Sequence, residues 1–124
     1  MPIIVRDYAG ARRLRLKATG PIDIAEMRAA VDQFRAGERR VLPILLDLSE
    51  ATLQFSSDDV AELAEERATE NKRSLLGPLA LVATEDEPFG ISRMFKAYSD
   101  ASGRHHVGVF RDRLTAERWL QSLE

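Results

Sequence analysis

The sequence predicts an α/β domain whose sheet is mostly parallel. Short apolar runs typical of strands alternate with segments in which apolar residues recur every three or four positions, which gives the order ββαβαβαβα. Such alternation after a leading hairpin favours right-handed crossovers between parallel strands, with one antiparallel strand at the sheet edge. The 124 residues suit a single domain, 1–124, large enough to bury a core without disulfides.

Five short runs predict the strands. In the second run, apolar residues alternate with basic ones, as in a strand with one exposed face, and the first two runs are expected to pair as a hairpin. The third and fourth runs are continuously apolar, as in strands buried on both faces, and Asp47 is expected near the carboxyl end of the third. The runs are residues 3–5, 12–18, 44–48, 79–83 and 107–110.

Four segments have helical periodicity and recognisable starts. Asp23 with Glu26 has the spacing of a capping box, and Pro88 suits the first turn of the third helix. Ser56 with Asp59, or Ser57 with Glu62 nearby, opens the second helix. The fourth helix reaches the C-terminus. On each helix we expect one inward apolar face, formed in turn by Ile24, Met27, Val31 and Phe34; Val60, Leu63, Ala64 and Ala68; Ile91, Met94, Phe95 and Tyr98; and Ala116, Trp119, Leu120 and Leu123.

Composition excludes several function classes. Without cysteine the chain has no disulfide, zinc-thiolate site or thiol nucleophile, which fits a cytoplasmic location. The longest nearly apolar stretch, residues 75–83, is too short to span a bilayer, so we expect no membrane insertion. Dinucleotide, Walker and zinc-protease motifs are missing, and His105 and His106 point to opposite faces of a strand start. We therefore expect no cofactor, no metal site and no catalytic residues.

Charge is unevenly distributed although the net charge is only −2. Residues 1–40 are basic, residues 41–70 are strongly acidic, and no overall basic field favours nucleic acid. Arg13, Arg15 and Lys17 on the outer face of the second strand are the best candidates for contact with an anion. This asymmetry would let a basic sheet face on one copy meet the acidic helix of another copy or of a partner. The alternative is that both are solvated surfaces.

Three segments together resemble the STAS domain of anti-sigma-factor antagonists. They are Gly20-Pro21-Ile22-Asp23, Asp47-Leu48-Ser49-Glu50-Ala51-Thr52 and Ser56-Ser57-Asp58. The resemblance implies that Ser56 matches a serine that a partner kinase phosphorylates. Phe55 and Asp58 stand where the family has an acid and a glycine, so we expect a degenerate phosphoswitch, and the alternative is that Ser56 or Ser57 only caps a helix.

The second half of the chain is similar to the SpoIIAA-like proteins of the STAS and CRAL-TRIO-like group. The similarity rests on Leu79-Ala80-Leu81-Val82-Ala83, Phe89-Gly90-Ile91-Ser92-Arg93-Met94-Phe95, Val109-Phe110-Arg111-Asp112, Ala116 and Trp119-Leu120. It implies a fold more firmly than a function. Within it, Arg93 has two interpretations: a guanidinium that holds an anion, or a local ion pair with residues 85–87.

Ligands of open α/β sheets bind outside the carboxyl ends of the strands. The residues expected at this crevice are Asp23, Asp47, Ser49, Phe55, Ser57, Phe89 and Arg93. Our first hypothesis is a non-catalytic regulatory or protein-interaction module that forms a homodimer. The alternative is a carrier of a small apolar or amphipathic molecule, in a pocket lined by Phe55, Phe89, Met94 and Tyr98. An unrecognised enzyme is the third hypothesis.

Overall fold

The structure is a computed structural model that describes residues 3–7, 13–34, 41–73, 76–101 and 106–123. These residues form five strands and four helices. In chain order they are β1 (Ile3–Asp7), β2 (Leu14–Asp23), α1 (Ile24–Phe34), β3 (Ile44–Gln54), α2 (Ser57–Arg73), β4 (Leu79–Val82), α3 (Asp86–Ala101), β5 (Val107–Phe110) and α4 (Arg113–Ser122). The predicted α/β class and the alternation of strands and helices are confirmed.

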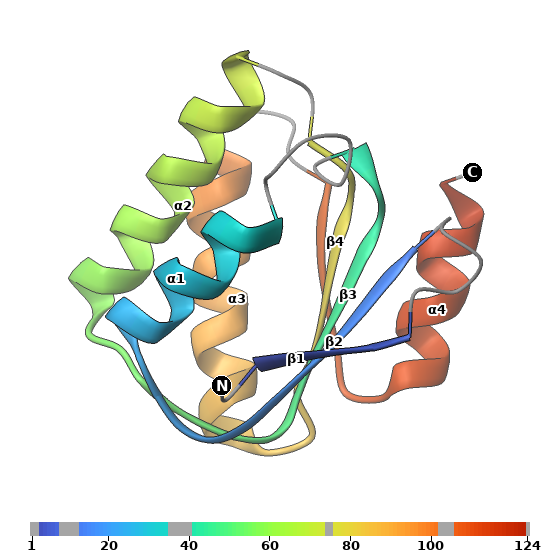
Figure 1. Ribbon diagram of the computed structural model, residues 1–124, viewed down its shortest axis with the longest axis horizontal. Coiled ribbons are helices and arrows are strands. Elements are labelled where there is room, and N and C mark those ends of the chain that lie inside the picture. The colour runs from blue at the N-terminus through green and yellow to red at the C-terminus, as the bar shows by residue number, and fades with distance from the viewer. Residues whose placement is uncertain (1–2, 8–12, 35–40, 74–75, 102–105, 124) are drawn as a thin grey trace.

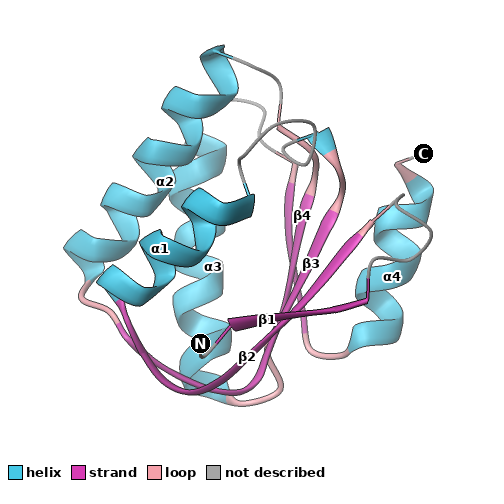
Figure 2. Ribbon diagram, viewed as in Figure 1, coloured by secondary structure: helices cyan, strands magenta, loops and turns pink. Residues whose placement is uncertain are grey.

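The strands form one sheet in the order β1-β2-β3-β4-β5. β2 to β5 are parallel to their neighbours, and β1 lies antiparallel to β2, with Ile3 opposite Ala18 and Val5 opposite Leu16. Helices α1, α2 and α3 cover one face of this sheet and α4 covers the other (Figure 1; Figure 2). The domain therefore has three layers, with three helices on one side and one on the other.

The alternation of side chains across the central strands supplies a core to both faces. Leu46 and Leu81 belong to the cluster on the side of α1, α2 and α3, whereas Leu45 and Val82 pack with Leu120 of α4. Burying a leucine side chain stabilises a fold by about 1.5–3 kcal/mol. Both faces of the central strands thus hold the layers together, as the continuous apolar runs predicted.

Strand β3 is longer than predicted, and Asp47 lies within it instead of near its end. The pairing with β2 shifts by one residue between Asp47 and Glu50, as at a β-bulge, and the Asp47 Oδ1 accepts a 2.9 Å hydrogen bond from the Ser49 N–H. Beyond the shift, Ala51 and Leu53 are again buried. The charged residues at the bulge interrupt the apolar run, so the sequence pattern ended the strand too early.

Two helices begin with the capping boxes that the sequence predicted. At α1, the Glu26 N–H donates to the Asp23 Oδ1 at 2.8 Å, and the Asp23 N–H donates to the Glu26 Oε1 at 3.1 Å. At α2, the Asp59 N–H donates to the Ser56 Oγ at 3.1 Å, and the Ser56 N–H donates to the Asp59 Oδ2 at 2.9 Å. Ser56 therefore acts as the N-terminal cap of α2.

The inward face of α3 differs from the prediction. Met94 and Tyr98 are 37% and 39% exposed, whereas Ser92 and Ser99 are buried. α3 packs closely against α2 as well as against the sheet, so its buried face includes small polar residues that an apolar pattern does not reveal. The predicted core residue Phe34 ends α1, and its side chain lies outside the described residues.

The cap of α2 gives a first prediction. Replacing Ser56 with alanine removes the oxygen that accepts the Asp59 N–H, so the free energy of unfolding should fall by about 1 kcal/mol. Ser57→Ala is the matched control, since Ser57 is the exposed first residue of the helix, and it should change stability by less than about 0.5 kcal/mol. Urea unfolding measures both; equal losses in the two variants would contradict the assignment of the cap.

The cap of α4 gives a pH prediction. Hydrogen bonds donated by the backbone N–H and then the hydroxyl of Thr115 lower the pKa of Asp112 below its ordinary value. The contribution of this carboxylate to stability is present above the unfolded pKa of about 3.9 and is lost as the pH falls through the lower folded pKa. The stability difference between the wild type and Asp112→Asn should therefore shrink in that acidic range, as followed by urea unfolding at successive pH values. A difference that stays constant would contradict this origin.

Candidate functional site

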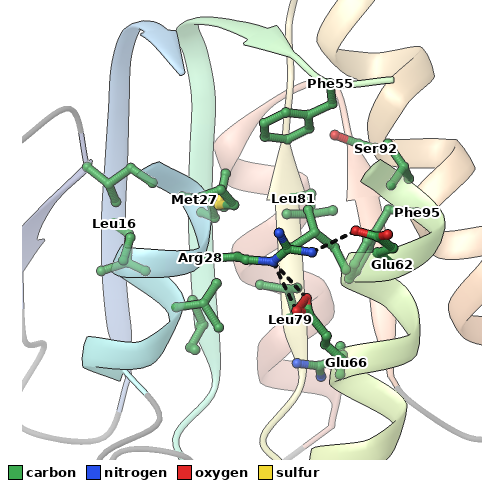
Figure 3. A pocket seen from close by; sticks show the side chains of 18 of the residues that line it. Leu16, Met27, Arg28, Phe55, Glu62, Glu66, Leu79, Leu81, Ser92 and Phe95 are labelled. Carbon is green, nitrogen blue, oxygen red and sulfur yellow. Dashed lines mark hydrogen bonds and ion pairs between the residues drawn. The ribbon is translucent and has the colours of Figure 1, made fainter. Parts of the chain in front are cut away.

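A cavity of about 740 Å³ lies between the sheet and helices α1, α2 and α3 (Figure 3). Its volume is within the usual range for small-molecule sites, roughly 300–1,000 Å³. The sheet supplies leucines to its floor, and the helices supply further apolar side chains to its walls. The floor includes Leu16, Leu46, Leu48, Leu53, Leu79 and Leu81, and the walls include Met27, Ala30, Val31, Leu63, Ile91 and Phe95. The cavity is therefore lined mainly by hydrocarbon.

The packing of α2 explains why this space is open. α2 contacts α3 extensively, and its buried residues Val60, Ala64 and Ala68 lie outside the two clusters that form the core on the sheet. Alanine side chains let two helices approach closely but reach only a short distance. α2 therefore packs mainly against α3 and covers the sheet beneath it incompletely.

Arg28 bridges α1 and α2 beside the cavity. Its Nη2 donates to the Glu62 Oε2 at 2.8 Å, and its Nε donates to the Glu66 Oε1 at 3.0 Å (Figure 3). These hydrogen bonds, to Glu62 first and then to Glu66, raise the pKa of Arg28. All three side chains are at least 40% exposed, so the bridge lies on the solvent side of the cavity.

A second arginine attaches α2 to the start of β4. Arg67 is buried, lines the cavity and donates from its Nη2 to the Gly77 carbonyl at 2.9 Å. Gly77 has no room for a side chain, because a Cβ atom there would lie 2.2 Å from the Leu42 carbonyl oxygen. The two arginines thus hold α2 above the sheet at fixed points.

The charged residues that line the cavity are mostly acidic. The basic ones among the described lining residues are Arg28 and Arg67, and both make the hydrogen bonds given above. The acidic lining residues, which we call the acidic rim, are Asp32, Glu62, Glu65, Glu66 and Glu70. The rim is half-buried to exposed, so its negative potential acts at the solvent side of the cavity.

One hydroxyl in the cavity wall has no hydrogen-bond partner among the residues that the structure describes. Ser92 on α3 is 2% exposed, and its Oγ has no hydrogen-bond partner in the described part of the chain. In Figure 3 its hydroxyl points from α3 into the cavity, on the side where Phe55 lies. A buried hydroxyl without a partner costs about 1–3 kcal/mol. Ser92 was not among the predicted site residues, and its place among the apolar residues of the third helix was the one sequence signal of its burial.

The residues predicted for the strand-end crevice have different roles in the structure. Phe55 lines the cavity, but Asp23 caps α1, Ser57 is the first residue of α2, and Asp47 accepts the hydrogen bond from Ser49 at the bulge. Because β2 and β3 continue past the end of β4, Asp47 and Ser49 lie within β3, whereas Asp23 pairs with Gln54 at its end, next to Phe55.

Of the two remaining crevice residues, Phe89 contacts Arg111, which was not among the predicted site residues. The Arg111 guanidinium stacks 3.7 Å from the Phe89 ring centroid and donates to Thr84 O at 3.1 Å and to Asp86 Oδ1 at 2.9 Å. Arg93 lies 6.0 Å from the same ring. Arg111 follows β5 directly, so this cluster joins the end of β5 to the start of α3.

The predicted carrier pocket is therefore in a different place from the cavity. Of its four expected lining residues, Phe55 lines the cavity, whereas Phe89, Met94 and Tyr98 do not. Met94 and Tyr98 are exposed, and Phe89 stacks with Arg111. The cavity instead lies under α1 and α2, because the sheet there is covered by helices that do not fill the space.

The predicted anion-contact stripe has acidic partners within the chain. Arg13 and Arg15 both bind the carboxylate of Glu117 on α4, and Arg13 is buried. Lys17 pairs with Glu50. Arg13 and Arg15 thus help to attach α4 to its face of the sheet, and Lys17 links β2 to β3.

The described residues provide neither a metal-ligand cluster nor a membrane-spanning helix. Within the described ranges, no three His, Cys, Asp or Glu residues lie close enough to hold a metal ion. Exposed His106 lies just before β5, and His105 falls outside the described residues. None of the helices, over the residues described for them, has the length and apolar character needed to cross a bilayer.

Comparison with known proteins supports the fold. The sequence matches no protein-family model and no curated protein sequence. Among solved structures, it is similar to an uncharacterized protein of the DUF3478 family from Shewanella loihica, described as having a SpoIIAA-like fold. The TM-score is 0.57 at 17% sequence identity, over 95% of this chain and 91% of the other. The chain therefore has the SpoIIAA-like α/β fold that its sequence motifs predicted.

Proposed function

We propose that this domain binds a small apolar or amphipathic molecule in the cavity beneath α1 and α2. The observation that carries the proposal is the combination of size and lining: about 740 Å³ bounded mainly by leucine and other hydrocarbon side chains. Binding there removes ligand hydrocarbon from water without requiring the protein to open a new space, and roughly 25 cal/mol is gained per Å² of apolar surface buried.

The surrounding contacts suit a binding site for such a molecule. The ion pairs of Arg28 with Glu62 and Glu66 join α1 to α2 on the solvent side, and exposed ion pairs of this kind are individually weak. These ion pairs position α1 and α2, and breaking them to open the cavity requires little free energy. In this proposal the domain is a non-catalytic carrier or ligand-responsive module, and the cavity is its functional site.

The cavity gives a direct test with diphenylhexatriene, a hydrocarbon dye that fluoresces strongly only in apolar surroundings. The wild type should bind the dye. Leu63→Trp should weaken dye binding roughly tenfold or more, because the larger side chain overpacks the cavity once the dye is bound, at a cost of about 1–3 kcal/mol. Leu114→Trp is the matched control, since Leu114 is 61% exposed on α4 across the sheet. Equal dye affinity in the wild type and Leu63→Trp would contradict binding in this cavity.

A second candidate function is protein interaction, with a homodimer as its simplest form. The observation that favours it is the pair Met94 and Tyr98, one turn apart on α3 and both more than a third exposed. Native mass spectrometry should then give a dimer that Met94→Glu converts to a monomer, whereas Leu114→Glu on α4 leaves it intact. A monomer in the wild type at micromolar concentration would contradict this candidate.

A further inference from the structure

We infer that Ser92 is the polar contact of the cavity and that it selects an uncharged amphiphile, a chain with one hydroxyl or carbonyl oxygen, over the corresponding carboxylate. The inference rests on the proposed function, since it concerns the ligand of the same cavity. It is carried by the buried Ser92 hydroxyl and by the charges on the cavity wall.

The Ser92 hydroxyl has both the position and the unused capacity for such a contact. It is 2% exposed, it lines the cavity, and its Oγ makes no hydrogen bond within the described chain. A helical serine commonly donates to the carbonyl four residues before it, and here it does not. The hydroxyl is thus able to donate to one ligand oxygen or accept from a ligand hydroxyl.

The surroundings of Ser92 favour an uncharged group. Phe55, Leu81 and Phe95 line the same cavity and provide no charge to pair with an anion (Figure 3). One hydroxyl cannot replace the hydration shell of a carboxylate, so an ionised ligand entering this part of the cavity loses far more than it gains. A neutral hydroxyl or carbonyl needs only the one hydrogen bond that Ser92 offers.

The solvent side of the cavity disfavours an anion as well. The acidic rim repels a carboxylate, and Arg28, the arginine on the solvent side, already binds Glu62 and Glu66. An acid would therefore meet repulsion at the rim and poor solvation at Ser92. A long-chain alcohol, aldehyde, ketone or ester meets neither difficulty.

The chain offers a control within the same helix. Ser99 is 0% exposed, and its Oγ also has no hydrogen-bond partner in the described residues, but Ser99 does not line the cavity. Removing either buried hydroxyl should raise the melting temperature or leave it unchanged, because an unsatisfied polar group is lost. Only the loss of Ser92 should alter the affinity for a ligand oxygen.

The experiment measures displacement of diphenylhexatriene by decanol, decane and decanoate from the wild type, Ser92→Ala and Ser99→Ala. In the wild type, decanol should bind about tenfold or more tightly than decanoate. Ser92→Ala should lower the affinity for decanol about threefold to tenfold, because one hydrogen bond is lost. The affinities for decane and for the dye should stay as they are in the wild type. Ser99→Ala should bind all ligands like the wild type.

The possible failures are distinct. If the wild type does not bind diphenylhexatriene, the proposed function is wrong and the inference falls with it. If the dye binds but Ser92→Ala leaves decanol affinity unchanged, the cavity stands and the role of Ser92 is overturned. If decanoate binds as tightly as decanol, the selection for an uncharged ligand is overturned. If Ser99→Ala loses as much decanol affinity as Ser92→Ala, the loss comes from altered helix packing, and the proposed hydrogen bond between Ser92 and the ligand is overturned.

Discussion

The packing of α2 against α3 is the constraint on which the functional side of this domain depends. The buried residues of α2 include the small side chains Ala64 and Ala68, which lie outside the core cluster of the sheet, whereas Leu63 packs against that cluster. The helix is held at this height by Arg28 on one side and by Arg67 at the start of β4. The leucines of the sheet beneath it belong to the core cluster of this face and also line the cavity.

The two faces of the sheet have opposite characters as a result. On the face that α4 covers, Leu45 and Val82 pack with Leu120, and Arg13 and Arg15 bind Glu117 across the layer boundary. Apolar packing and paired charge close that face. On the other face, three helices surround a cavity with an apolar floor, a buried serine and an acidic rim. One face therefore provides structural support, and the other provides the space for a ligand.

Much of the fold could be predicted from the sequence, because its signals are local. The helical spacing and the capping pairs Asp23–Glu26 and Ser56–Asp59 depend on residues within one turn, and the structure confirms both caps. The extension of β3 was missed because Asp47 and Glu50 interrupt the apolar run at a bulge. The cavity and Ser92 were missed because they depend on how far α2 lies from the sheet, a distance that no periodicity encodes.

A crystal structure grown with a long-chain alcohol that carries bromine at its far end would test the central claim most directly. The expected result is an alcohol oxygen within hydrogen-bond distance of the Ser92 Oγ and an anomalous bromine signal inside the cavity, beyond Leu81 towards Leu79. A structure in which α2 packs onto the leucines of the sheet, leaving no space and no ordered alcohol, would contradict the claim that this face of the domain is a binding site.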